Sequence, residues 1–147
     1  QIEFYFSANV GESVKPIAKV ASGGEASRLM LILKTTARLA RENEKAMVFD
    51  EVDVGIGGRV AEAVGLKLKE LARTQQVLCV THQPQVASLA DHHFLVEKQA
   101  VGGKRTEVRV RELGEKEKVE EIARMLTGKE ITETARRHAK EMLSAAR

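Results

Sequence analysis

Two short apolar runs alternate with longer segments of helical periodicity, and this alternation is the feature that most limits how the chain can fold. The runs are Ala46–Phe49 and "QVLCVT", Gln76 to Thr81. Residues spaced for one face of a helix occupy 25–41 before the first run and 60–73 between the two. Apolar strands separated by helices are typical of parallel sheets with helical crossovers. The pattern predicts an α/β fold with a largely parallel sheet.

The flanking sequence predicts the remaining elements. Alternating residues in "QIEFYFS" predict a half-buried strand, followed by a loop that contains glycine and proline. Pro84 suits the first turn of a short helix, "PQVASLA". "HHFLVEK" and "RTEVRVREL" predict a β-hairpin with Thr106, Val108 and Val110 on one face. Two helices complete the chain, and the first has Gly128 at its carboxyl end.

Composition excludes several classes of protein. The 147 residues suffice for one core, so we expect residues 1–147 to form one domain or part of one. A net charge of +3 is too small to indicate a nucleic-acid surface by itself, and scarce aromatic residues disfavour a base-stacking platform. Without a membrane-length apolar run or a secretory leader, we expect a soluble cytoplasmic protein with no membrane contact. The single cysteine, Cys79, is expected to be a small buried residue.

The first residues indicate a piece of a longer protein. The chain has no initiator Met and enters directly as a strand. We therefore expect further sequence upstream.

Three carboxylates follow the first apolar run, in "KAMVFDEVDVGIGG". At the carboxyl end of a buried strand, Asp50 and Glu51 would lie on the ligand-binding edge of an α/β sheet. In a nucleoside-triphosphate enzyme, such an Asp holds Mg²⁺ and the next residue orients the attacking water. Two other functions are compatible with the same residues. "DEVD" matches a helicase box, and Asp50, Glu51 and Asp53 with His82 could bind two metals for phosphodiester cleavage.

A pair of glycines opens the first long helix, in "ASGGEASR". Ser22 and Glu25 have the spacing of a capping box. Gly23 and Gly24 are not needed for a cap, and a helix start stripped of side chains also lets a phosphate approach the backbone N–H groups. The residues alone leave capping and anion binding equally open.

Taken in order, these motifs resemble the ATP-binding-cassette (ABC) ATPase heads of the SMC/RecN group. "ASGGEASRLMLILK" resembles the signature motif, with Ala21 where Leu is common. "MVFDE" resembles the Walker B strand, "VDVGIGGR" the D-loop, and "VLCVTHQPQVASLADHHFLVEK" the switch-histidine segment. The tail "EEIARMLTGKEITETARRHAKEML" resembles the RecN branch in particular. The resemblance covers nearly the whole chain and implies the carboxyl-terminal part of a P-loop ATPase head, with a terminal β-hairpin and carboxyl-terminal helices.

The resemblance also implies roles for individual residues. Asp50 would hold Mg²⁺, Glu51 would be the general base for ATP hydrolysis, and His82 would contact the γ-phosphate. Asp53 would lie in the loop that couples two active sites across a dimer. The signature residues would contact ATP bound to a second head, with Glu25 and Arg28 shaping the helix start; they are Ser22, Gly23, Gly24 and Glu25.

One expected motif is missing from these residues. G-x-x-x-x-G-K-[ST], the Walker A loop that grips the triphosphate, does not occur. The resemblance places it in an amino-terminal half, so the expected partners are that half, a second ATP-bound head, and DNA. We expect the complete protein to be an ATPase in DNA double-strand-break repair and recombination, in the bacterial cytoplasm at the nucleoid. The isolated chain is expected to be inactive.

Several alternatives remain at this stage. The helicase interpretation weakens because the second strand ends "VTHQ" rather than Ser-Ala-Thr. A dimerisation module without chemistry and a metal-dependent nuclease stay open. Arg105, Arg109 and Arg111 form a possible basic stripe on the hairpin, although exposed strand arginines are usually just solvated. His92 and His93 are interpreted as hairpin-strand residues.

Overall fold

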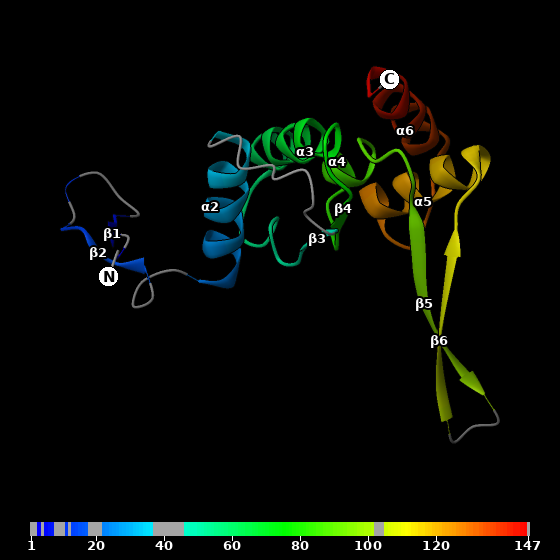
Figure 1. Ribbon diagram of the computed structural model, residues 1–147. Coiled ribbons are helices and arrows are strands. Elements are labelled where there is room, and N and C mark those ends of the chain that lie inside the picture. The colour runs from blue at the N-terminus through cyan, green and yellow to red at the C-terminus, as the bar shows by residue number, and fades with distance from the viewer. Residues whose placement is uncertain are drawn as a thin grey trace. The chain divides into compact units, whose positions relative to one another are not determined.

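The computed structural model describes residues 3, 5–7, 11, 13–17, 22–36, 46–101 and 105–146 (Figure 1). The chain divides into two compact units, Gln1–Thr81 and His82–Arg147. Among the described residues, no helix combines the length and apolar character needed to cross a membrane.

The first unit begins with two short antiparallel strands, β1 (Tyr5–Phe6) and β2 (Lys15–Pro16). β1 agrees with the end of the predicted strand, whose Ile2 and Phe4 lie outside the described residues. β2 falls within the predicted loop. A strand of two residues is too short for a period-2 pattern, so only its pairing with β1 reveals it.

Helices and strands then alternate as the apolar pattern predicts. The order is α2 (Gly23–Thr36), β3 (Met47–Phe49), α3 (Gly58–Ala72) and β4 (Val77–Cys79). β3 and β4 are parallel, with Val48 opposite Leu78, and the N–H of Val80 donates to the carbonyl of Phe49 at 2.9 Å. In the described residues this is the one parallel pair, and β1–β2 and β5–β6 form separate antiparallel sheets. The end of the predicted first helix, 37–41, lies outside the described residues.

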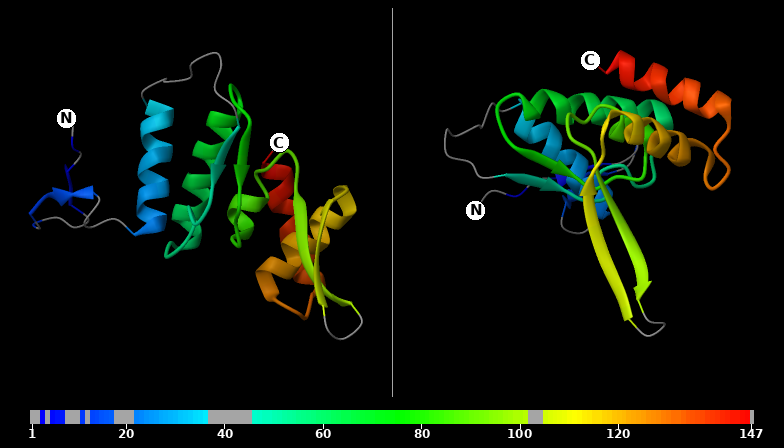
Figure 2. Two further views of the ribbon diagram at one scale, coloured as in Figure 1. Left: turned by 60° about the horizontal axis from the view of Figure 1, so that its bottom comes forward. Right: turned by 90° about the vertical axis from the view of Figure 1, so that its right-hand side faces the viewer.

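The core of the first unit forms where α3 packs beside the β3–β4 pair (Figure 2). Buried positions recur every three or four residues along α3, which is the spacing of one helix face. They are Ala61, Val64, Leu68 and Leu71, joined by Phe49 of β3 and Leu31 of α2. Val60, the first residue of the helix predicted at 60–73, is half exposed, and Ala61 is the first buried position.

The second unit contains α4 (Pro84–Ala87), the hairpin β5 (Phe94–Val101) and β6 (Arg105–Glu112), and the helices α5 (Glu115–Thr127) and α6 (Glu133–Ala145). Pro84 lies in the first turn of α4, as expected. The register confirms the predicted hairpin: Val110 lies opposite Val96 and Val108 opposite Lys98, on one face. The hairpin extends as an exposed arm (Figures 1 and 2).

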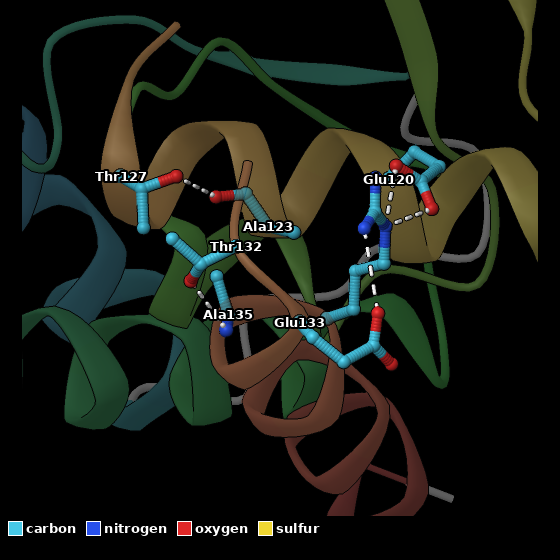
Figure 3. Close-up of polar contacts among 7 residues, drawn as sticks. Glu120, Ala123, Thr127, Thr132, Glu133 and Ala135 are labelled. Carbon is cyan, nitrogen blue, oxygen red and sulfur yellow. Dashed lines mark hydrogen bonds and ion pairs between the residues drawn. The ribbon is translucent and has the colours of Figure 1, made fainter. Parts of the chain in front are cut away.

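Helices α5 and α6 pack around a small apolar core. Its buried residues are Ala87, Ile122, Ala123, Ala135 and Ala139. Polar contacts fix the helix ends (Figure 3): Thr132 Oγ1 accepts from the N–H of Ala135 at 3.1 Å, and Thr127 Oγ1 donates to the carbonyl of Ala123 at 3.0 Å. Gly128, with φ of 81°, closes α5 as predicted.

Candidate functional site

The carboxylate turn, residues 50–54, directly follows β3. Asp50 and Glu51 are both exposed, and Asp50 Oδ1 accepts from the N–H of Glu51 at 2.9 Å. Glu51 has φ of 59°, and its carbonyl accepts from the N–H of Val54 at 3.1 Å. A residue other than glycine in this left-handed region costs roughly 1–2 kcal/mol. Contacts from the surroundings must therefore hold the turn.

The predicted capping box is present at the start of α2. Glu25 Oε2 accepts from the backbone N–H of Ser22 at 2.8 Å and from its hydroxyl at 3.0 Å, while the N–H of Glu25 donates to Ser22 Oγ at 3.4 Å. The backbone hydrogen bond, and after it the hydroxyl, lowers the pKa of Glu25. Glu25 thus shapes the helix start, as the family resemblance implies.

The two glycines of α2 lie against the carboxylate turn of the same chain. A Cβ at Gly24 would lie 2.8 Å from the carbonyl oxygen of Glu51 and 3.3 Å from that of Val54. A Cβ at Gly23 would collide with the carboxylate of Glu51. The structure therefore has its own reason for the glycines: a side chain at Gly24 would push the backbone of the turn away, and one at Gly23 would displace the Glu51 carboxylate. Sequence reasoning missed this contact because the two motifs lie far apart along the chain.

Two further side chains of α2 hold the turn through its backbone. Arg28 Nη1 donates to the carbonyls of Val52, at 3.2 Å, and Val54, at 3.0 Å. Ser27 Oγ donates to the carbonyl of Asp50 at 2.9 Å. The resemblance implied that Arg28 shapes the helix start, whereas the structure directs its guanidinium to the turn. Ser27 was not predicted, since a serine inside a helix carries no sequence signal of its own.

Asp53 lies inside the first unit. The residue is 1% exposed, and its carboxylate accepts a hydrogen bond from Thr81 Oγ1, just beyond β4. The bond joins the carboxylate turn after β3 to the end of the neighbouring parallel strand. Asp53 therefore has a structural role within its own unit, whatever the loop around it contacts.

Replacing Thr81 by valine tests this internal bond. The variant keeps the shape of the side chain but removes the hydroxyl donor from a buried carboxylate, so we expect a loss of about 1–3 kcal/mol in the free energy of unfolding. Urea unfolding of the chain measures the loss. Thr81→Ser keeps the hydroxyl and serves as the control. Equal stability of Thr81→Val and the unmodified chain would contradict the structural role.

The carboxylates fit a magnesium site better than a two-metal site. Asp50 and Glu51 are exposed while Asp53 is buried, and no group of three His, Cys, Asp or Glu side chains among the described residues could hold a metal ion. Mg²⁺ needs fewer protein ligands, because it keeps several waters and takes one or two carboxylates together with phosphate oxygens. The carboxylate of Asp50, an exposed residue, suits that donor set.

The histidines lie in the second unit. His82, which follows Thr81 directly, is exposed. His92 Nδ1 lies 2.7 Å from Glu112 Oε1, and the carbonyl of His93 accepts from the N–H of Leu113 at 2.8 Å. His92 and His93 therefore lie at the base of the hairpin, just before β5, and not within its strand as predicted.

Cys79 of β4 is a partly buried free cysteine. Burial, and after it the negative charges of Asp53 and Asp50, raises its pKa to about 12. Since the thiolate is the reactive form of cysteine, a pKa this high disfavours reaction at Cys79 near neutral pH.

The arginines of the hairpin are interleaved with carboxylates. Arg111 Nη1 lies 2.5 Å from Glu117 Oε1 and its Nε lies 3.8 Å from Glu97 Oε2. Arg109 is directly opposite Glu97 in the register. The possible basic stripe is thus partly neutralised by its own neighbours.

The fold and these motifs are those of one class of protein: the chain has the fold of part of an ABC-type ATPase head. A solved structure from work on ATP-driven dimerization and DNA stimulated activation of SMC ATPases matches it with a TM-score of 0.53 at 16% identity. The match covers 82% of this chain and 70% of that chain. No protein-family model matches the sequence.

The particular likeness is to the DNA repair protein RecN. The chain is 52% identical to RecN of Halalkalibacterium halodurans and 46% identical to RecN of Bacillus subtilis, each over 145 residues, 99% of this chain and 25% of the relative. It is 48% identical to RecN of Mycobacterium leprae over 147 residues, all of this chain and 24% of the relative. The resemblance to RecN is thereby confirmed, and the chain spans about a quarter of the length of these curated relatives.

Proposed function

We propose that this chain is the catalytic carboxyl-terminal part of an ATP-hydrolysing head that acts in DNA double-strand-break repair and recombination. The heads would dimerise around ATP, at the bacterial nucleoid in the cytoplasm. The observation that carries the proposal is the contact between the glycine-led start of α2 and the carboxylate turn. These are the two motifs that ABC-type heads bring to nucleotide. The similarity to RecN points to DNA repair as the process.

Each site residue has a role in this proposal. Asp50 would hold Mg²⁺, which when bound neutralises charge on the phosphates. Glu51 would orient the attacking water and accept its proton, and His82 would donate a hydrogen bond to a phosphate oxygen. Their exposure supports these roles, because each must be reached by ligand.

The start of α2 would serve the nucleotide of a second head. The backbone N–H groups of Gly23 and Gly24, with the positive end of the helix dipole, would face its phosphates. The hydroxyl of Ser22 donates to Glu25 in the structure and would have to turn away from it to reach a phosphate. Asp53 would act from within the unit, by holding the loop that meets the other head.

An uncovered sheet face supports the proposed amino-terminal partner. Val48 and Leu78 are neighbours on β3 and β4, and they are 69% and 47% exposed. Parallel sheets are normally covered on both faces. Since the chain spans about a quarter of its relatives, we assign this face to the remaining sequence of the same protein, which would also bring the Walker A loop.

Joining the chain to that sequence tests the function directly. We expect the 147-residue chain alone neither to bind ATP measurably nor to hydrolyse it, because it lacks the Walker A loop that binds the triphosphate. Adding the separately made amino-terminal half, or using the complete gene product, should produce Mg²⁺-dependent hydrolysis. Val48→Asp should weaken the reconstitution and barely change the folding of the chain alone, since its side chain is already in water there. The matched control is Val60→Asp, at a half-exposed position of α3.

The outcomes separate the competing functions. Nucleotide binding and head pairing without hydrolysis would indicate a dimerisation module instead. DNA cleavage with Mg²⁺ or Mn²⁺ in the absence of nucleotide would indicate a nuclease. Hydrolysis by the chain alone that disappears in Glu51→Gln would contradict the need for the other half.

A further inference from the structure

We infer that Arg28 is a positioning residue for Glu51: from α2 it holds the carboxylate turn in its strained conformation, so that the glycine-led helix start and the catalytic carboxylates behave as one rigid piece. The inference rests on the proposed function for its catalytic consequence. Its physical basis stands apart from that function, in hydrogen bonds between α2 and the turn.

Contacts from outside the turn are needed to stabilise its backbone conformation. Glu51 is in the left-handed region, with φ of 59°, and it is the one described residue other than glycine with a positive φ. Its side chain is exposed, so packing around that side chain does little to keep the conformation. Strained backbone persists where the surroundings over-determine it.

Arg28 provides the main stabilising contacts to the turn. One guanidinium nitrogen, Nη1, donates to the carbonyls of Val52 and Val54, which lie on either side of the buried Asp53. The hydroxyl of Ser27 adds a bond to the carbonyl of Asp50 on the other side of Glu51. Three carbonyls of the turn are thus bound from two consecutive residues of one helix.

The glycines make this contact possible. Gly24 is buried, and a Cβ there would lie 3.0 Å from Arg28 Nη1 as well as 2.8 Å from the carbonyl oxygen of Glu51. α2 and the turn therefore meet backbone to backbone, with the guanidinium beside the contact. Whatever orders the start of α2, including a phosphate from a second head, would order the turn of the same chain through these bonds.

Amide hydrogen exchange combined with kinetics tests the inference in the complete gene product. Arg28→Met removes the hydrogen-bond donors and keeps much of the side-chain length, whereas Arg28→Lys keeps a charged donor. Ser27→Ala removes the hydrogen bond from Ser27 to the turn. Arg73→Met, at the far end of α3, is the control. Exchange in the peptide spanning 50–55 reports the turn, and exchange in α3, which belongs to the same unit, reports the integrity of that unit.

We expect Arg28→Met to speed exchange of the 50–55 peptide by at least about tenfold while α3 is unchanged. The kcat for ATP should fall on the order of tenfold to a hundredfold with KM within about threefold, because a misplaced base slows chemistry more than binding. Arg28→Lys should restore part of both, and Ser27→Ala should show a smaller loss of the same kind. A purely structural role would lower stability throughout and would not separate kcat from KM.

Two results would overturn the inference. One is unchanged exchange of the 50–55 peptide in Arg28→Met, and the other is faster exchange with an unchanged kcat. Failure of the proposed function is distinguishable, because Glu51→Gln would then hydrolyse ATP as the parent protein does. In that case the exchange data alone decide whether Arg28 holds the turn.

Discussion

Glu51→Gln is expected to lower the kcat for ATP hydrolysis in the complete gene product by about 10²–10⁴-fold, which is the usual contribution of a positioned general base. Glutamine has nearly the same shape but cannot accept the proton of the attacking water. Nucleotide would still bind, because Asp50 and the amino-terminal half are unchanged. ATP-bound head pairs should therefore accumulate, as measured by size-exclusion chromatography with light scattering.

A matched substitution controls for the loss of one negative charge. Glu62 is an exposed glutamate on α3, and Glu62→Gln should hydrolyse ATP as the parent protein does. Asp50→Asn should impair ATP hydrolysis in a different way, by raising the Mg²⁺ concentration that hydrolysis requires. Normal hydrolysis by Glu51→Gln would show that another group is the base.

The second large effect is expected at Gly24. Alanine there places a Cβ 2.8 Å from a backbone oxygen of the carboxylate turn, so either α2 or the turn must move. Forcing a methyl group into such a contact costs about 1–3 kcal/mol, more than the roughly 1 kcal/mol by which Ala favours a helix over Gly. We expect Gly24→Ala to lower the midpoint of urea unfolding of the chain.

Gly23 provides the matched comparison. Its added Cβ would meet the far end of the Glu51 side chain, which can swing aside at little cost. Gly23→Ala should therefore be neutral or slightly stabilising, by up to about 1 kcal/mol. In the complete gene product, both variants should hydrolyse ATP poorly. Gly23→Ala displaces the Glu51 carboxylate, and Gly24→Ala displaces the backbone of the turn. Equal unfolding midpoints for Gly23→Ala and Gly24→Ala would contradict the backbone contact.

Much of the fold was predictable because its signals are local. The alternation of apolar runs and helical periodicity predicted α2, β3, α3 and β4 in order, and the parallel pairing of β3 with β4 followed from it. Capping chemistry predicted Ser22 with Glu25 and the end of α5 at Gly128. β2, with only two residues, carried no such signal.

The candidate site was predictable in its residue types and less so in its arrangement. The carboxylates and the glycines were singled out by residue type and spacing, and the resemblance to the SMC/RecN group gave them roles. Ser27 was missed, and Arg28 was assigned to the helix start rather than to the turn. Asp53 was expected in a coupling loop, and its burial against Thr81 was not foreseen.

By itself, the sequence determined the order of helices and strands, the carboxylate cluster after β3 and the glycine-led start of α2, since each depends on residues close together in the chain. Only the tertiary structure decided that the glycine pair and the carboxylate turn touch, with Arg28 binding two carbonyls across the contact. The reason is physical: every residue has the same backbone carbonyl. A hydrogen bond to a carbonyl therefore does not depend on the residue type of the accepting segment and cannot be predicted from its sequence.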